Sequence, residues 1–292
     1  MFKGSVTALI TPFRNGKVDE ARLKANVDFQ IKNKTSALLP CGTTGESPTL
    51  SNEEHKRVIQ IVLKAARGRV PVMAGTGSNS TGEAVEMTKY AKKIGCDAAL
   101  MVSPYYNKPT QKGIYLHFKK VAESVDIPIM LYNIPGRTGI TIEAVTMAKL
   151  RNDCKNIIGV KEATGSLDMA SQIVSACGRD FCVMSGDDNL TLPIMSVGGK
   201  GIISVISNIV PRQVADMTAA YARKDFAKAL ELHYYLFPLM KAAFIETNPI
   251  PVKTAMMLAG MDTGEMRLPM CSMEEGTLRK LTEVMRTYGL VK

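Results

Sequence analysis

A lysine directly continues a short apolar run near the middle of the sequence. Lys161 follows Ile157–Val160, a run typical of a strand that is buried on both faces. A solvated strand end is the ordinary place for a lysine, but here the surroundings are expected to be apolar. Burial disfavours the charged ammonium and increases the share of neutral amine. A neutral amine attacks carbonyl carbons, so this position predicts a lysine that forms a Schiff base with its substrate.

A second group of polar residues follows an earlier apolar run. Gly42–Ser47 has two glycines around two threonines and follows the apolar run Ala37–Pro40. Glycine permits a tight turn whose backbone N–H groups converge, which is a suitable cradle for a carboxylate. The alternative interpretation is an ordinary turn in which a Thr or Ser side chain begins a helix.

Four further segments at the ends of apolar runs carry groups that could contact a substrate. Tyr132–Thr138 places Arg137 on a loop shaped by Pro and Gly; it suits bidentate capture of a carboxylate, although a surface arginine is an equal alternative. Ser103–Asn107 contains paired tyrosines, which usually lie in a core or an interface. Ser185–Asp188 can begin a helix or contact a second substrate, and Gly201–Ser204 can turn a backbone carbonyl towards a ligand.

The elements that must position these residues alternate between two types. Between the apolar runs lie amphipathic stretches that open with Ser or Thr caps and stop at Gly. Continuous apolar runs of this length are typical of parallel strands, so eight such units predict an α/β fold, a (β/α)₈ TIM barrel, with a long doubly wound sheet as the alternative. The predicted strands are Val6–Ile10, Ala37–Pro40, Val70–Met73, Ala98–Val102, Ile127–Tyr132, Ile157–Val160, Phe181–Met184 and Gly201–Val205.

The predicted barrel occupies residues 1–224 and closes with a helix that begins at Pro211. Residues 225–292 predict a C-terminal helical domain. Its expected helices are Phe226–Ala243, Val252–Leu258 and Met273–Tyr288. Because the chemistry of such barrels lies at the carboxyl ends of the strands, the polar residues described above form the candidate site.

Composition excludes several classes of protein. The 292 residues are 46% apolar and 22% charged, which is ordinary for a globular protein. The patterns H-E-x-x-H, G-x-x-x-x-G-K-[ST] and G-x-S-x-G are missing, so a zinc hydrolase, a P-loop NTPase and a serine hydrolase are disfavoured. The six cysteines form no C-x-x-C pair, which indicates reduced thiols and a cytoplasmic location.

Charge and hydropathy also bear on partners. With 37 basic and 27 acidic side chains the net charge is +10, but the basic residues occur in pairs at most and alternate with acidic ones. We therefore interpret them as solvated helix faces and expect no nucleic-acid partner. Apolar runs stay well below the roughly 18 residues of a membrane span, and the first residues lack a signal-peptide pattern, so we expect no membrane partner.

These motifs resemble those of the dihydrodipicolinate synthase (4-hydroxy-tetrahydrodipicolinate synthase) family, a group of pyruvate-dependent Schiff-base lyases. The resemblance covers essentially the whole chain. Gly42–Glu46 and Lys161–Thr164 are typical of the superfamily, whereas Tyr132–Thr138 and Asn248–Lys253 are typical of the synthases. It implies a TIM-barrel lyase of diaminopimelate and lysine biosynthesis that condenses pyruvate with L-aspartate 4-semialdehyde. It also implies a homotetramer built as a dimer of dimers, and no cofactor or metal.

The resemblance assigns catalytic roles to four residues of this sequence. Lys161 forms the imine with pyruvate, and Tyr132 moves protons to and from the imine and the aldol oxygen. Thr43 links Tyr132 to Tyr106, which reaches in from a neighbouring subunit.

The remaining implied residues bind substrates or an inhibitor. The substrate-binding set is Thr44 for the pyruvate carboxylate, Ile203 and Gly186 beside the substrates, and Arg137 for the carboxylate of L-aspartate 4-semialdehyde. A site for feedback inhibition by L-lysine is implied at Ser47, His55, Asn79, Glu83 and Tyr105. Pro48 and Asn52 stand where some lysine-sensitive members carry Ala and His.

Two other functions stay open at this point. A lyase for N-acetylneuraminate or a 2-keto-3-deoxy sugar acid belongs to the same superfamily and shares Lys161 and Tyr132. Arg137 favours the synthase, because a small amino-acid carboxylate needs a cation whereas a sugar chain prefers hydroxyl partners. A nucleic-acid-binding protein without catalysis is supported by the +10 charge alone.

Overall fold

The computed structural model describes residues 2–291, which group into two compact units. The first unit is Pro71–Ile203 with residues 2–3. The second is Gly4–Val70 with residues 204–291. Each unit therefore combines segments that are far apart in the sequence.

The first unit is built on parallel strands in the order β10-β9-β8-β7-β6-β5, so each strand lies beside its neighbour in the chain. The strands are β5 (Met73–Gly75), β6 (Ala98–Val102), β7 (Ile129–Asn133), β8 (Ile157–Glu162), β9 (Cys182–Ser185) and β10 (Gly201–Ser204, of which the first three residues belong here). Nearly all their residues are buried, as the continuous apolar runs predict.

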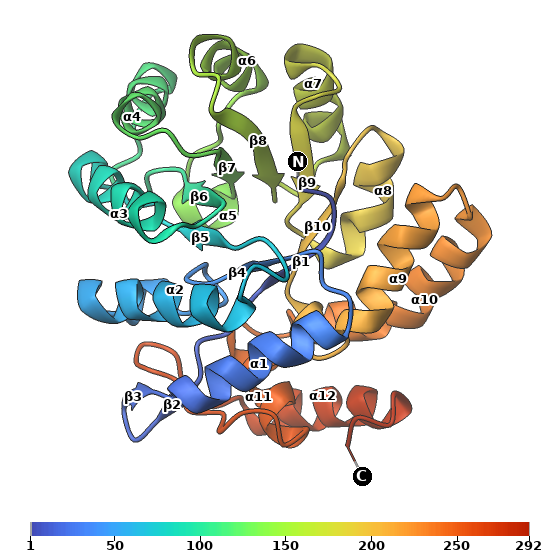
Figure 1. Ribbon diagram of the computed structural model, residues 1–292. Helices are drawn as coiled ribbons and strands as arrows, with labels where there is room; N and C mark the ends of the chain where they lie inside the picture. Colours follow the sequence, from blue (N-terminus) through green and yellow to red (C-terminus); the bar gives the residue numbers. More distant parts are fainter. Residues whose placement is uncertain (1, 292) are drawn as a thin grey trace. The chain divides into compact units, whose positions relative to one another are not determined.

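Helices connect these strands and cover their outer side, where α3, α4, α6 and α7 are seen in Figure 1. They are α3 (Thr81–Ile94), α4 (Gln111–Ser124), α5 (Pro135–Thr138), α6 (Ala144–Asp153), α7 (Leu167–Cys177) and α8 (Thr191–Ser196), with the short 3₁₀ helix η2 (Asp188–Leu190). The predicted caps are confirmed for α3, where the Ser80 hydroxyl accepts from the Glu83 N–H and Gly95 ends the helix in the left-handed conformation. The predicted opening of α6 at Thr141 is wrong, because its N-cap is Glu143, without a side-chain hydrogen bond.

The second unit contains the parallel pair β1 (Gly4–Ala8) and β4 (Ala37–Leu39) and the antiparallel hairpin β2 (Phe13–Arg14) and β3 (Lys17–Val18). Helix α1 packs on α2, α9 on α10, and α12 on both α10 and α11 (Figure 1). The helices are α1 (Glu20–Lys32), α2 (Asn52–Ala66), α9 (Pro211–Ala222), α10 (Phe226–Ala242), α11 (Ile250–Leu258) and α12 (Glu275–Thr287), with the 3₁₀ turns η1 (Ser47–Thr49) and η3 (Ile206–Asn208).

Two local differences from the sequence-based expectation have clear causes. The strand predicted at Val70–Met73 is displaced to β5: Pro71 has no N–H for a strand ladder, the Val72 N–H donates to the Asp97 side chain, and pairing with β6 starts at Met73. The hairpin β2–β3 was not predicted, although Asn15-Gly16 is a strong hairpin signal and both residues have positive φ angles, 54° and 74°. The division between residues 224 and 225 stays a prediction.

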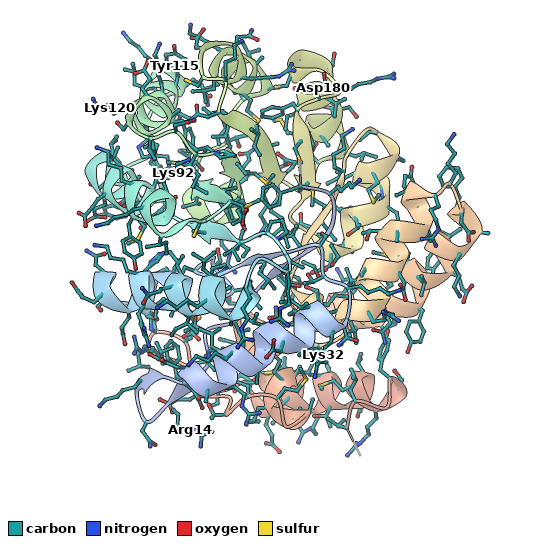
Figure 2. All side chains as sticks on the ribbon, in the orientation of Figure 1. Arg14, Lys32, Lys92, Tyr115, Lys120 and Asp180 are labelled. Carbon is teal, nitrogen blue, oxygen red and sulfur yellow. The ribbon has the colours of Figure 1, made fainter. Side chains whose placement is uncertain are left out.

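Basic side chains lie on outward helix faces of both units. Lys32 on α1, Lys92 on α3 and Lys120 on α4 are exposed and dispersed over the surface (Figure 2). This agrees with their interpretation as solvated faces. Among the described residues, no helix is both long and apolar enough to span a membrane.

Gly159 provides a test of how closely β8 and β9 approach. A Cβ atom there would lie 2.2 Å from the carbonyl oxygen of Cys182, so the strands would have to separate. We expect Gly159→Ala to lower the free energy of unfolding by about 1–3 kcal/mol, measured by urea denaturation. The control is Gly276→Ala in α12, where no neighbouring atom lies within 4 Å of the new Cβ. Equal stability of the two variants would contradict this close approach.

Candidate active site

Lys161 and Tyr132 are neighbours at the carboxyl ends of two adjacent strands. They face each other in the register of β7 and β8, and the Lys161 Nζ lies 4.3 Å from the centroid of the Tyr132 ring. Lys161 is 5% exposed and Tyr132 is 6% exposed. The predicted nucleophile is therefore buried, with its amine held against an aromatic ring that also carries a phenol hydroxyl.

Gly186, directly after β9, lies close to the aliphatic part of the Lys161 side chain. A Cβ atom at Gly186 would lie 2.6 Å from the Cβ of Ala163 and 3.2 Å from the Cε of Lys161, so this position requires glycine. Next along the chain, burial raises the pKa of Asp187, and the positive charge of Lys161 acts in the opposite direction. Gly186 thus lies beside the candidate nucleophile, whereas Ile203 is fully buried on β10, with β9 between it and β8.

Arg137 lies on the loop that leaves β7. The loop contains the single-turn helix α5, in which the Thr138 hydroxyl donates to the carbonyls of Ile134 and Ile140, at 3.1 and 2.9 Å. Thr138 is buried, and Arg137 beside it is exposed. A buried hydroxyl therefore fixes the turn from which the guanidinium extends.

The loop after β6 carries the paired tyrosines. Tyr106 has a φ angle of 72° and a side chain that is 90% exposed. The Asn79 side chain donates to the Tyr105 carbonyl at 3.1 Å, and the Ser78 hydroxyl donates to the Glu83 carboxylate at 2.7 Å. Asn79 and Tyr105, two members of the implied lysine site, are thus in contact, with Glu83 a few residues further along.

In the second unit, Gly42–Ser47 forms a turn with two unused donors. Among the described residues, the backbone N–H groups of Thr43 and Thr44 donate to no protein acceptor, whereas the three N–H groups that follow donate to carbonyls of the turn itself. The Asn248 side chain donates to the Thr44 hydroxyl at 3.1 Å. Thr44 is 2% exposed. The turn therefore offers adjacent backbone donors, as a carboxylate cradle requires.

A buried ion pair fixes this turn. Glu46 has a φ angle of 51° and is 2% exposed, and its carboxylate lies 2.6 Å from the ammonium of the fully buried Lys253. The Lys253 ammonium also donates to the carbonyls of Glu265 at 2.6 Å and Thr11 at 3.0 Å, which satisfies all three of its protons. The second oxygen of Glu46 accepts from the Arg267 N–H at 3.1 Å. Sequence analysis assigned no role to this pair.

Arg267 extends the same network to the start of α2. Its guanidinium donates to both carboxylate oxygens of Glu54, at 2.7 and 2.6 Å. This hydrogen-bonded pairing lowers the pKa of Glu54 to about 2, despite some desolvation. The two other residues of the implied lysine site lie nearby in the chain: Ser47 in η1 and His55 in the first turn of α2, each partly exposed.

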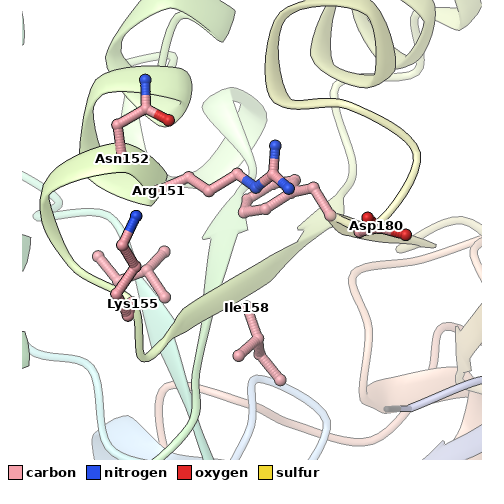
Figure 3. A pocket seen from close by; sticks show the side chains of 7 residues that line it. Arg151, Asn152, Lys155, Ile158 and Asp180 are labelled. Atoms are coloured by element: carbon pink, nitrogen blue, oxygen red, sulfur yellow. The ribbon is translucent and has the colours of Figure 1, made fainter.

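A hollow in the first unit lies away from these groups. Its lining comes from the end of α6, the start of β8 and the residues before β9: Arg151, Asn152, Lys155, Ile157, Ile158, Asp180 and Phe181 (Figure 3). This is the amino end of β8, whereas Lys161 lies near its carboxyl end. In the described part of the chain no three His, Cys, Asp or Glu side chains gather where they could hold a metal ion.

The chain is similar to known proteins in both sequence and structure. The model of the dihydrodipicolinate synthetase family matches residues 1–287. The 4-hydroxy-tetrahydrodipicolinate synthase of Endomicrobium trichonymphae is 54% identical over 292 residues, covering all of both chains. The crystal structure of dihydrodipicolinate synthase from Aquifex aeolicus superposes with a TM-score of 0.98 at 53% identity, covering 99% of each chain. The structure from Cyanidioschyzon merolae with lysine bound has a TM-score of 0.96 at 41% identity and 99% coverage of each chain.

The chain belongs to the dihydrodipicolinate synthetase family. Its fold is the predicted TIM barrel followed by helices, as in the matching crystal structure. The predicted class of enzyme, a lyase, and the predicted activity, that of a 4-hydroxy-tetrahydrodipicolinate synthase, are confirmed. These relatives favour the synthase over the sugar-acid lyase that the sequence left open.

Replacing Lys253 tests the buried ion pair. Lys253→Met leaves the Glu46 carboxylate buried without its cation, and we expect a loss of about 3–5 kcal/mol in the free energy of unfolding, measured by urea denaturation at pH 7. The matched control is Lys228→Met, which breaks an exposed pair with Glu231 and is expected to cost less than about 1 kcal/mol. Adding Glu46→Gln to Lys253→Met removes both charges and is expected to recover part of the loss. A loss at Lys253 no larger than at Lys228 argues against this interpretation.

Proposed function

We propose that the chain condenses pyruvate with L-aspartate 4-semialdehyde through an imine on Lys161. The observation that carries this proposal is the buried amine of Lys161, 4.3 Å from the ring of Tyr132 at the ends of adjacent strands. The amine adds to the ketone of pyruvate and water leaves as the imine forms. Loss of a C3 proton then gives an enamine, whose carbon attacks the aldehyde. The amino group of the second substrate finally displaces Lys161 as the ring closes, so one water is released overall.

The carboxylate of pyruvate is assigned to the turn in the second unit. The N–H groups of Thr43 and Thr44 are adjacent donors without a protein acceptor among the described residues. Backbone donors that converge in a turn bind an anion at little cost in reorganisation, because their positions are fixed before the ligand arrives. The buried ion pair between Glu46 and Lys253 supports this assignment, because it fixes the backbone of the turn.

Tyr132 is proposed to move protons in the reaction. Its ring lies beside the amine of Lys161, so its hydroxyl is placed to serve groups bonded to that nitrogen. The resemblance adds Thr43 and Tyr106 to this relay, the latter from a neighbouring subunit. The 90% exposure of the Tyr106 side chain supports a contribution to a second chain. We propose that the chain forms a homotetramer built as a dimer of dimers. We also propose a cytoplasmic location.

Arg137 is proposed to bind the carboxylate of L-aspartate 4-semialdehyde. Its exposed guanidinium on a fixed turn can form two parallel hydrogen bonds with a carboxylate. Gly186 leaves room beside Lys161, and the backbone of Ile203 is proposed to lie against the bound pyruvate.

Feedback inhibition by L-lysine is proposed at Ser47, His55, Asn79, Glu83 and Tyr105. The contact of Asn79 with Tyr105 and the relative that was crystallised with lysine bound support it. Residues 225–292 are proposed as a helical domain that also supports catalysis, because Asn248 and Lys253 contact the turn that carries Thr44.

Trapping the imine tests the proposed function directly. Borohydride added with pyruvate is expected to reduce the imine and leave a stable adduct on Lys161, located by mass spectrometry of tryptic peptides. Borohydride without pyruvate is the control and should give no adduct. An adduct on another lysine, or cleavage of sugar acids with no condensation of the two proposed substrates, would overturn the proposal.

Removing one hydroxyl tests the proton relay. Tyr132→Phe keeps the ring beside Lys161 and is expected to lower kcat by roughly 10²–10⁴-fold, the usual contribution of an acid–base group. Tyr115→Phe on α4 is the matched control, since it removes a surface hydroxyl that donates to Asp153. Near-normal turnover of Tyr132→Phe in the steady-state assay would exclude the relay.

A further inference from the structure

Directly after the candidate catalytic pair, β7 and β8 carry a second pair of facing residues. Asn133 is opposite Glu162, one step beyond Tyr132 and Lys161 in the same register. Successive side chains of a strand point to opposite faces, so Asn133 and Glu162 project away from the face that carries Tyr132 and Lys161. Asn133 is fully buried and Glu162 is 1% exposed. Burying two polar side chains costs free energy unless hydrogen bonds compensate for the lost water.

The pair forms a chain of hydrogen bonds with a fixed direction. The Asn133 amide donates to Glu162 Oε2 at 3.0 Å, and the Thr164 N–H donates to Glu162 Oε1 at 2.7 Å. The carbonyl oxygen of the Asn133 side chain accepts from the Ile142 N–H at 2.9 Å. Both oxygens of Glu162 are thus used as acceptors, and Asn133 is the link between the carboxylate and Ile142.

Ile142 is where the Arg137 loop ends. We define this loop as residues 134–142, which leave β7 and lead to α6. Its beginning is covalently attached to Asn133 and its end is held by the Asn133 side chain, so one residue closes the loop. The Asn133 amide nitrogen also donates to the Ile142 carbonyl at 3.4 Å, so Ile142 contacts both ends of this amide. Glu162 provides the shorter acceptor contact, at 3.0 Å, and thereby directs the amide nitrogen towards β8.

We propose that Asn133 and Glu162 are a positioning pair that fixes the Arg137 loop and thereby sets the affinity for the second, carboxylate-bearing substrate. The proposal rests on the proposed function for the role of Arg137. The pair acts through the loop and touches no reacting atom. Burial raises the pKa of Glu162, and the hydrogen bonds from Thr164 and Asn133 oppose this, so the same donors that direct the chain also favour the carboxylate.

Three variants separate positioning from other roles. Glu162→Gln turns an amide NH₂ towards the Asn133 NH₂, donor against donor. Asn133→Asp sets two carboxylates face to face. The double variant exchanges donor and acceptor: the new amide at 162 donates to the new carboxylate at 133, whose other oxygen still accepts from Ile142. It restores the directed chain while it moves the negative charge to the other strand.

The first measurement is kinetic. Each single variant is expected to raise the KM for L-aspartate 4-semialdehyde about tenfold, the size of one lost hydrogen bond to a charged group. The pyruvate concentration that gives half-maximal adduct formation on Lys161 should stay within about twofold of the wild-type value. The variants are expected to weaken binding of the second substrate only, which leaves imine formation with pyruvate unchanged. The double variant should return the KM to near the wild-type value, and Arg137→Ala gives the reference for complete loss of the guanidinium.

The second measurement does not depend on activity. Arg137 is exposed, so trypsin can cut after it once the loop opens, and cleavage there should be faster in each single variant and normal in the double variant. Cleavage after Lys228 on α10 reports general destabilisation and should not change. Where Glu162→Gln does not fold, Asn133→Asp serves as the single variant.

The outcomes are distinct. Unchanged KM and unchanged cleavage after Arg137 in folded single variants overturn the positioning pair. A double variant that stays as impaired as the single ones also overturns it, because Glu162 would then act through its own charge. If the wild-type protein forms no adduct with pyruvate, the proposed function fails, and faster cleavage after Arg137 still supports the pair as the element that fixes the loop.

Discussion

The contact between the buried amine of Lys161 and the ring of Tyr132 is the interaction on which the proposed active site depends. Its significance is clear from a comparison with Lys253, the other buried lysine among residues 2–291. The Lys253 ammonium is saturated by a carboxylate and two carbonyls, so it has no lone pair to offer and serves to fix a turn. Lys161 forms no ion pair among the described residues and contacts an aromatic face instead. The same side chain is thus structural in one unit and a candidate nucleophile in the other.

The strand period of two places the candidate catalytic pair and the proposed positioning pair on opposite faces of the same two strands. Tyr132 and Lys161 share one face, and the residues that follow them, Asn133 and Glu162, share the other. A shift of register by one residue would exchange the two sets. Where β8 meets β9, Gly159 is paired with Cys182 and leaves no room for a side chain between the two strands. The positions of the candidate catalytic pair and of the buried pair behind it therefore both depend on how β7 and β8 are aligned.

The sequence predicts this alignment only in part. Continuous apolar runs located the strands, and Ala98–Val102 was predicted with its observed bounds. Lys161 was recognised because it follows such a run. The strand at Val70–Met73 was misplaced because hydrophobicity shows neither that Pro71 lacks an N–H nor that the Asp97 side chain accepts from the Val72 N–H. The pairing of Asn133 with Glu162 was not predicted, because it requires the register between strands whose residues are 29 positions apart.

The largest gap between sequence and structure concerns the C-terminal helices. Glu46 and Lys253 are 207 positions apart, and nothing local in either segment indicates that they meet. Glu46 holds a left-handed backbone conformation that is costly for a non-glycine residue and persists only where the surroundings determine it. Lys253 on α11 provides that determination by pairing with a carboxylate that has no access to water. The observed form of the turn that carries Thr43 and Thr44 therefore depends on a contact with α11, so the C-terminal helices contribute to the structure of the proposed carboxylate cradle.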